Sequence, residues 1–322
     1  MIVTLTANPS LDRTIELADR LVRGEVQRAF STSEQPGGKG VNVSRALIAS
    51  GIDTVAVLPG NTADPMLVAL RAERIPVASL MIGGRIRSNI TLTEPDGTTT
   101  KINEPGPILS DSEERCLIEV VVTHSRNAQW LVLAGSLPPG LSPDFYARVI
   151  EAVRAAGAHP PRIAADSSGA PLHALIASGI GVDLIKPNAE ELAELTGRGD
   201  PALLEADPSA AFAAAMELVS QGCGAVLATL GRHGAVLATA EGGWVATMPP
   251  IVPRSTVGAG DSSLAGYLLA DARGDAAEQR LAQAVAHGAA AAALPGSTMP
   301  SAAQTRPETA IIHRIISNLT ER

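Results

Sequence analysis

The feature that most constrains the fold is a regular alternation of short apolar runs with longer segments of helical spacing. The apolar runs predict strands at 2–5, 54–58, 77–81, 130–134, 162–165, 184–186 and 225–229. Helices are expected at 65–75, 142–156, 208–220, 262–272, 278–293 and 305–319, and after the capping box Ser110–Glu113. This alternation predicts an α/β fold, a doubly wound and mostly parallel sheet with helices on both faces.

Two segments depart from the alternation. Residues 13–35 mix charges with short alternating pieces, and residues 85–103 read as two alternating strands about the turn Pro95-Asp96-Gly97. Polar-faced strands of this kind are expected to form a small β-sheet lid over a site. No internal repeat or linker divides the chain. Residues 1–322 are therefore expected to form one domain that carries lid segments at about 13–35 and 85–103.

Composition disfavours several classes of function. Aromatic residues make up only 2% of the chain, which argues against a stacking platform for single-stranded nucleic acid. A formal net charge of −8 argues against a general polyanion binder. No apolar run reaches the roughly 18–20 residues that span a bilayer, and Met1–Thr6 reads as a first strand, not a signal peptide. We expect a cytoplasmic protein that binds neither nucleic acid nor membrane.

Clusters of glycine and polar residues fall at the ends of the predicted strands, at 8–12, 135–140, 166–169, 186–191, 229–234 and 255–261. In open parallel sheets, ligands gather at the carboxyl ends of the strands, along one edge. The six clusters are therefore expected to converge on one site.

The last cluster carries the clearest chemistry. Gly258, Ala259 and Gly260 precede a single carboxylate, Asp261, and an apolar helical segment follows. The first amides of a helix have no intrahelical partners and can hold an anion. The arrangement suggests phosphoryl transfer, with Asp261 accepting the proton of the acceptor hydroxyl. The alternative is an ordinary N-cap aspartate after a glycine turn, and the convergence of the clusters favours the first interpretation.

A second glycine-rich turn, Gly37-Gly38-Lys39-Gly40, opens a predicted helix with Asn42 one turn inside it. It is not a Walker A motif, because glycine follows the lysine, and it is not GxGxxG. Close approach of the backbone to a ligand is its expected use. Asp12, at the end of the first strand, is either a turn residue or a ligand for a polyol hydroxyl.

Taken together, these motifs resemble those of a known family. Pro36–Val43 and Thr256–Ser262 resemble the two signatures of the phosphofructokinase B family of ribokinase-like sugar kinases, and the similarity runs nearly end to end. Residues 6–12, 101–107, 135–140 and 185–188 resemble the branch that acts on phosphorylated ketohexoses. The resemblance implies ATP-dependent phosphorylation of fructose 1-phosphate to fructose 1,6-bisphosphate. Fructose 6-phosphate and tagatose 6-phosphate are the alternative substrates.

The resemblance also implies a role for each matching position. The catalytic base would be Asp261, with Gly258, Ala259 and Gly260 as the anion hole. The sugar would be held by Asp12, Gly37, Gly38, Lys39 and Asn42, and its own phosphate by Arg28, Arg87, Lys101 and Ser136. ATP would contact Lys186, Asn188, Thr229, Gly231, Gly234, Gly258, Gly260, His287 and Gly288. Mg²⁺ would be positioned by Asn188 and Glu191, largely through water.

Some questions stay open at this point. Some relatives carry a lysine two residues before the Arg28 position, where this chain has Val26, so the preferred sugar phosphate is not fixed. A homodimer through the lid strands is expected, since edge strands invite pairing. The rival functions are a kinase of unphosphorylated sugars or nucleosides, a non-catalytic sugar sensor, and a nicotinamide-dependent dehydrogenase. The last lacks its GxGxxG turn here.

Overall fold

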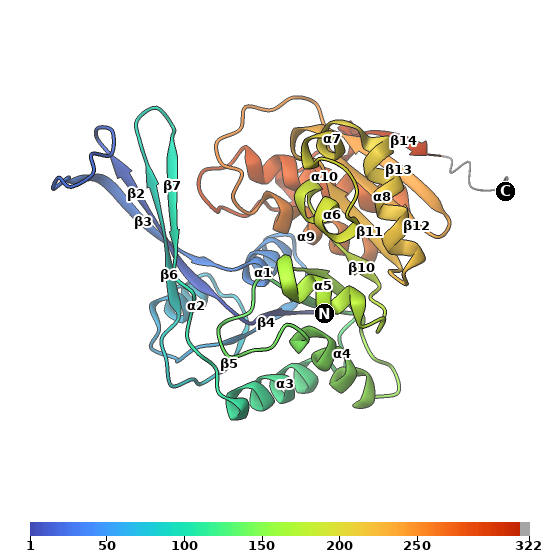
Figure 1. Ribbon diagram of the computed structural model, residues 1–322, viewed down its shortest axis with the longest axis horizontal. Helices are drawn as coiled ribbons and strands as arrows, with labels where there is room; N and C mark the ends of the chain where they lie inside the picture. Colours follow the sequence, from blue (N-terminus) through green and yellow to red (C-terminus); the bar gives the residue numbers. More distant parts are fainter. Residues whose placement is uncertain (316–322) are drawn as a thin grey trace.

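The computed structural model describes residues 1–315, in which a ten-stranded main sheet stands beside a separate four-stranded sheet (Figure 1). The main sheet has the order β14-β13-β12-β11-β10-β9-β8-β1-β4-β5, parallel from β11 to β5 and antiparallel from β11 to β14. Its strands are β1 (Ile2–Thr6), β4 (Thr54–Pro59), β5 (Val77–Leu80), β8 (Trp130–Ala134), β9 (Arg162–Asp166), β10 (Leu184–Ile185), β11 (Ala225–Thr229), β12 (Ala235–Thr239), β13 (Gly242–Thr247) and β14 (Ile311–Ile315).

Helices cover both faces of this sheet, because alternate residues of the central strands point into two different cores. In β8, Leu131 and Leu133 pack in the core beneath α4, whereas Trp130 and Val132 pack in the core beneath α9. The helices are α1 (Lys39–Ala49), α2 (Pro65–Ala72), α3 (Asp111–Ser125), α4 (Phe145–Ala155), α5 (Gly169–Ala177), α6 (Ala189–Thr196), α7 (Pro201–Ala206), α8 (Pro208–Ser220), α9 (Ala259–Ala272) and α10 (Ala277–Ala292). The predicted doubly wound α/β fold is confirmed.

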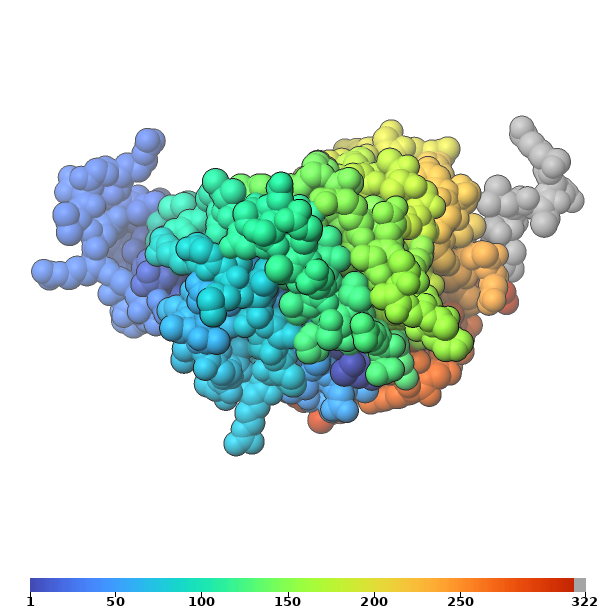
Figure 2. Space-filling model, turned by 90° about the horizontal axis from the view of Figure 1, so that it is seen from below, coloured from blue at the N-terminus to red at the C-terminus, as the bar shows by residue number. Residues whose placement is uncertain are grey.

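The smaller sheet is the lid, in the order β3-β2-β6-β7. Its strands are β2 (Ser10–Leu17), β3 (Ala29–Gly37), β6 (Arg87–Thr93) and β7 (Thr99–Asn103). β2 starts three residues after β1 ends, so the lid grows directly out of the carboxyl edge of the main sheet. The hairpin of β2 and β3, blue in Figure 2, stands away from the body at one end of the molecule.

One predicted helix is wrong. Residues 305–315 of the segment 305–319 form a short 3₁₀ turn and the edge strand β14, which pairs antiparallel with β13; residues 316–319 lie outside the described residues. The run Ile311-Ile312-His313-Arg314-Ile315 is rich in β-branched residues, which favour a pleated strand over a helix. Helices α5 and α6 were not predicted, because their first residues had been assigned to the strand-end clusters, and the six-residue helix α7 was not predicted either. None of the described helices is long and apolar enough to cross a membrane.

Candidate active site

Asp261 lies in the first turn of α9, where the chain turns sharply into the helix. Gly258 is the N-cap residue and has a φ of 76°, a left-handed conformation that costs little only for glycine. Asp261 is buried, with 7% of its surface exposed, and its Oδ2 accepts a hydrogen bond of 2.8 Å from Asn42 Nδ2 of α1. The two predicted helix starts therefore meet at this carboxylate.

A cluster of buried charges surrounds Asp261. Lys39 Nζ donates to Asp166 Oδ1 at 2.7 Å and lies 3.4 Å from Glu191 Oε1. Lys186 Nζ lies 3.1 Å from Asp166 Oδ2, and a methyl group built on Gly260 would be 3.2 Å from the same ammonium. Two lysine ammonium groups and the Gly260 amide of α9 therefore lie in one small region, which is a favourable environment for phosphate oxygens; the neighbouring Ala259 amide donates to the Thr256 carbonyl at 3.3 Å.

The surroundings shift the pKa values of Asp261 and Asp166 in opposite directions. Burial raises the pKa of Asp261 to about 6, and the charge of Asp166 adds to the effect, against the hydrogen bond from Asn42 and the charges of both lysines. Burial also opposes ionisation of Asp166, yet the ammonium groups of Lys186 and Lys39 hold its pKa below the usual value. Asp166 is thus a fixed anion, whereas Asp261 can take up a proton near neutral pH.

Asn188 and Glu191, predicted to position Mg²⁺, form the capping box of α6. Asn188 Oδ1 accepts from the Glu191 amide at 2.8 Å, and Glu191 Oε2 accepts from the Asn188 amide at 2.9 Å. Within residues 1–315 no group of three His, Cys, Asp or Glu side chains is arranged to ligate a metal directly. The water-mediated contact of these two side chains with Mg²⁺ stays a prediction.

Asp12 is held at the lid end of the same region. Its Oδ1 accepts hydrogen bonds from Ser10 Oγ at 2.7 Å and from Asn89 Nδ2, across the β2–β6 pair, at 3.1 Å. A side chain at Gly37 would collide with the Asp12 carboxylate, so only glycine lets β3 pass this close. Gly38, the N-cap of α1, comes next, which places the lid carboxylate at the start of the helix that carries Lys39 and Asn42.

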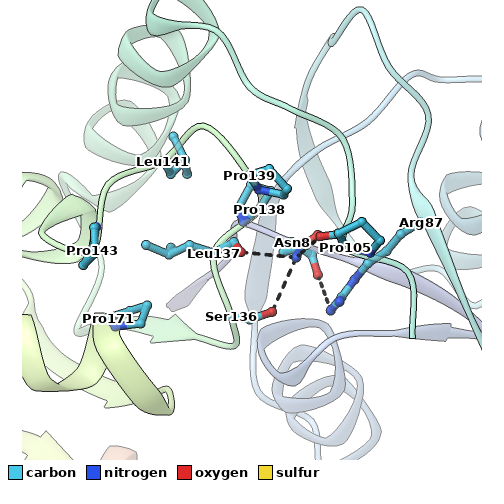
Figure 3. A pocket seen from close by; sticks show the side chains of 10 residues that line it. All are labelled: Asn8, Arg87, Pro105, Ser136, Leu137, Pro138, Pro139, Leu141, Pro143 and Pro171. Carbon is cyan, nitrogen blue, oxygen red and sulfur yellow. Dashed lines mark hydrogen bonds between the residues drawn. The ribbon is translucent and has the colours of Figure 1, made fainter. Parts of the chain in front are cut away.

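A pocket of about 440 Å³ opens between the lid and the end of β8 (Figure 3). Asn8 lies at its centre and donates to Pro105 O at 3.0 Å and Ser136 Oγ at 3.4 Å. Arg87 reaches into it and donates to the carbonyls of Asn8 and Glu104, each at 3.1 Å. Prolines and leucines form the remaining wall. The structure therefore brings Arg87 and Ser136 together around one polar end of this pocket.

Arg28 and Lys101 are not brought to Arg87 within one chain. Arg28 precedes Ala29, which pairs with Leu17, about 17 Å beyond Asp12 at the usual rise of a strand. Lys101 lies on the edge strand β7 opposite Thr91 and is exposed. Neither side chain makes a hydrogen bond or ion pair with another of the described residues. Strand register, which the sequence does not reveal, separates the three predicted cations.

The residues predicted to contact ATP divide into two groups. Thr229 ends β11 and bridges to Asn188, and the tight turn that includes Gly231 and Gly234 follows at the carboxyl edge of the sheet. Gly288 packs α10 closely against Ser263 in the first turns of α9. These four residues lie along or next to the site.

The prediction that His287 contacts ATP is corrected by the structure. Its side chain has no exposed surface; Nε2 lies 3.2 Å from Ser50 Oγ and Nδ1 lies 3.1 Å from the Gln283 carbonyl. Burial lowers its pKa to about 4, so the ring is neutral. The phase of α10 turns this ring into the interface with α1 and α9, where it cannot contact a bound nucleotide.

Sequence reasoning missed three residues of the site: Asp166, Asn8 and Asn89. Two of them fell within the strand-end clusters 166–169 and 8–12, so their position was visible although no role was assigned. The oxygens of Asn8, Asn42 and Asn89 and the hydroxyl of Thr6 are buried here without a protein partner. Buried polar atoms are rarely left unpaired, so the oxygens of Asn42 and Asn89, whose amide nitrogens bind Asp261 and Asp12, suit the hydroxyl groups of a ligand.

Comparison with known proteins agrees with this geometry. A family model described as pfkB family carbohydrate kinase matches residues 5–304. The 1-phosphofructokinase of Bacillus subtilis (strain 168) is 34% identical over 270 residues, covering 83% of this chain and 84% of that protein. The ATP-dependent 6-phosphofructokinase isozyme 2 of Escherichia coli (strain K12) is 33% identical over 317 residues, covering 97% and 99%. A crystal structure of phosphofructokinase-2 from Escherichia coli in complex with substrates and products has a TM-score of 0.85 at 32% identity, covering 94% and 96%.

The buried carboxylate generates a prediction about stability. An unfolded Asp261 ionises near pH 3.8, whereas the folded protein keeps its proton to about pH 6. Between pH 3.8 and about pH 6 the folded state binds more protons than the unfolded state, so the free energy of unfolding falls as pH rises. Above about pH 6 this destabilisation has reached its full size. Asp261→Asn is therefore expected to raise the free energy of unfolding at pH 7 by roughly 2–3 kcal/mol.

Urea denaturation of wild type and Asp261→Asn from pH 4 to pH 8 checks this. The difference between the two proteins should be greatest above pH 6 and should shrink toward zero near pH 4. A difference that is independent of pH would show that ionisation of Asp261 is not its source.

Proposed function

Since the chain belongs to the pfkB family of carbohydrate kinases, we propose that it transfers the γ-phosphoryl group of ATP to fructose 1-phosphate and forms fructose 1,6-bisphosphate. Family membership makes the chain a phosphotransferase that acts on a sugar phosphate. The observation that carries the proposal is the buried Asp261 carboxylate, facing two lysines and the Gly260 amide of α9. In this proposal residues 1–322 act as one kinase unit with the lid as its movable part.

Asp261 has the properties of the base in such a transfer. The attacking sugar hydroxyl forms a bond to the γ-phosphorus, the bond to the β-phosphate oxygen breaks, and the hydroxyl proton passes to Asp261. A pKa of about 6 puts the carboxylate closer to neutral pH than a free aspartate, which improves it as a base while leaving it mostly ionised at pH 7. A loose transition state lets this proton move late. The Gly258–Gly260 amides and Lys186 stabilise charge on the transferring group.

The sugar fits between the lid and α1. Asp12, Asn42 and the backbone of Gly37 and Gly38 supply polar groups for ring hydroxyls, and Lys39 anchors the start of α1 beside them. Arg87 and Ser136 line the pocket that would receive the phosphate already on the sugar. Arg28 and Lys101 remain predictions for that phosphate, since one chain alone does not bring them there.

ATP and Mg²⁺ belong on the opposite side of Asp261. The turn from Thr229 to Gly234 and the amides at Gly258 and Gly260 would hold the nucleotide phosphates, with Asn188 and Gly288 nearby. Asn188 and Glu191 are the oxygen donors that would meet Mg²⁺ through water, and Asp166, which shares Lys39 with Glu191, adds a nearby negative charge. When bound, the ion supplies neutralising charge to the phosphates. Because ATP and sugar phosphates are metabolites of the cytoplasm, we propose that the protein works there.

The position of the phosphate on the sugar is the finer part of the proposal. The two CH₂OH arms of β-fructofuranose are related by a near two-fold axis, so one pocket accepts either phosphate with the ring turned over. A 6-phosphofructokinase isozyme covers nearly all of this chain, which keeps fructose 6-phosphate as the second candidate. Tagatose 6-phosphate is the third.

A substrate panel tests the proposal directly. Coupled measurement of ADP release should give the highest kcat/KM with fructose 1-phosphate, compared with fructose 6-phosphate, tagatose 6-phosphate and free fructose. Highest turnover with another ketohexose phosphate would move the assignment within the family. Turnover with unphosphorylated sugars alone would refute the assigned phosphate pocket.

The role of Asp261 makes a separate prediction. Asp261→Asn should lose roughly 10²–10⁴-fold in kcat and change KM for the sugar phosphate little, because the amide keeps its bond to Asn42 but cannot accept a proton. In the wild type, kcat/KM should fall as pH drops through about 6. Near-normal turnover by this variant would remove Asp261 from the role of base.

Arg87 tests the phosphate pocket. Arg87→Ala should raise KM for the phosphorylated sugar at least tenfold and leave KM for ATP nearly unchanged, because a charged donor to a dianion is lost. Arg85→Ala, two residues away and 81% exposed, is the matched control and should have little effect. Equal weakening of both substrates in Arg87→Ala would argue against the assignment.

The lid also supports the proposal of a homodimer. Large apolar side chains are exposed on it within one chain: Val26 is 98% exposed, Phe30 78% and Ile102 54%. β3 and β7 are free sheet edges as well. Exposed apolar groups gathered on one element are typical of an interface with another copy or partner.

Phe30→Glu should therefore shift the protein from dimer to monomer in sedimentation velocity at micromolar concentration, since a charge would be buried in the interface. Leu203→Glu changes a leucine that is 52% exposed on α7, which packs on α6 and α8 of the main body, and serves as control. A dimer unaffected by Phe30→Glu would place the interface elsewhere.

A further inference from the structure

A short segment after α10 joins the lid to the start of α9. We call residues 295–299 the connector; they lie between the end of α10 and the 3₁₀ turn at Ala302–Gln304. Ser297 and Met299 are its buried members, with 4% and 9% of their surfaces exposed. A buried connector transmits a shift of one neighbour to the other because close-packed atoms have little room to absorb it.

The lid end of the connector is fixed by Gln35. Its Oε1 accepts two hydrogen bonds from Ser297, one from the amide at 3.0 Å and one from the hydroxyl. Gln35 lies on β3 directly opposite Asp12 of β2. The carboxylate proposed to bind the sugar and the amide that holds the connector are thus neighbours across one strand pair.

The opposite end of the connector touches the anion hole. A methyl group built on Gly258 would lie 2.6 Å from Met299 Cε, and Ser262 Oγ lies 3.5 Å from Met299 Sδ. Met299 therefore packs against the N-cap of α9, whose amides are proposed to hold the transferring phosphoryl group.

The middle of the connector is tied to the main body. Arg45 of α1 donates to the Ser297 carbonyl at 3.0 Å and pairs with Glu73 through two bonds of 2.6 and 3.0 Å. α1 also carries Asn42, which binds Asp261. The connector is thus a fixed link with defined contacts at the lid, at α1 and at α9.

We propose that Gln35 is a positioning residue through which sugar-phosphate binding at the lid and ATP binding at the anion hole strengthen each other. The inference rests on the proposed function. Binding of the sugar at Asp12 selects one position of the β2–β3 pair, and Gln35 carries that position to Ser297. Met299, which packs against Gly258, then fixes the position of the Gly258 backbone at the start of α9. Coupling of this kind is reciprocal, so ATP must favour sugar binding by the same factor.

The experiment measures that factor. Isothermal titration gives the Kd of Mg²⁺ with a non-hydrolysable ATP analogue, with and without saturating fructose 1-phosphate, or whichever sugar phosphate the substrate panel selects. The wild type should bind the analogue at least about fivefold more tightly with the sugar phosphate present. Gln35→Met keeps the length of the side chain but removes the acceptor, and should bring the ratio to within about twofold of 1.

Two variants control for loss of structure. Gln35→Glu keeps the acceptor oxygen and should keep the ratio above that of Gln35→Met. Glu34→Gln changes the next residue on β3, which pairs with Arg13 at the surface, and should leave the ratio unchanged. If Gln35→Met does not fold, Ser297→Ala, which removes one of the two donors, must lower the ratio instead.

The outcomes separate the two ideas. The role of Gln35 is overturned if both ligands bind the wild type but the Kd of the ATP analogue is the same with and without sugar phosphate. It is also overturned if Gln35→Met leaves the ratio of the two Kd values unchanged. Either result leaves the kinase assignment standing. Failure of every sugar phosphate to bind overturns the assignment and the inference together. Weaker binding of both ligands with the ratio preserved means that Gln35 is only structural, and also overturns the inference.

Discussion

The arrangement of the site depends on holding one carboxylate, Asp261, in a buried place without leaving its charge unbalanced. Burial of an ion is costly, and nearby opposite charges offset only part of the cost. Here Lys39 and Lys186 approach from α1 and the end of β10, and both ammonium groups form ion pairs with the buried Asp166. The ends of β9 and β10 and the starts of α1 and α9 must therefore meet at the same point, which is what a parallel sheet with helices on both faces provides.

The lid provides a local positive charge in a protein that is acidic overall. The protein is net acidic, so a dianionic substrate is attracted only where local cations gather. Arg87 is half-buried and fixed by two backbone carbonyls, and burial lowers its pKa although Asp12 opposes the effect. A guanidinium remains charged under these conditions. In the proposed function, the main sheet thus supplies the chemistry of transfer, and the lid supplies much of the recognition of the sugar phosphate.

The sequence predicted the local features well and the distant pairings poorly. The start of α9 was readable because Gly258 and Asp261 are neighbours in the chain, and the strand runs were readable because both of their faces are apolar. Asp166 was not assigned a role, since its partners Lys39 and Lys186 meet it only in three dimensions. His287 was misplaced because a residue number does not give the phase of a helix against its neighbours. Arg28 was grouped with Arg87 on the strength of the family resemblance, and the strand register that separates them within one chain could not be read from the sequence.

The difference between the lid cations bears on how one fold can serve sugars phosphorylated at different positions. Arg87 has two of its donors committed to the carbonyls of Asn8 and Glu104, so it presents its charge from a fixed place. Arg28 and Lys101 are exposed and make no such bonds among the described residues, and strand register keeps them apart from Arg87 within one chain. In the proposed function, the fixed position of Arg87 therefore sets where the phosphate of the sugar must lie. In the same proposal, selectivity between fructose phosphates depends on the groups proposed to contact the ring, Asp12, Asn42 and Asn89, whose positions the hydrogen bonds of the lid and of α1 define.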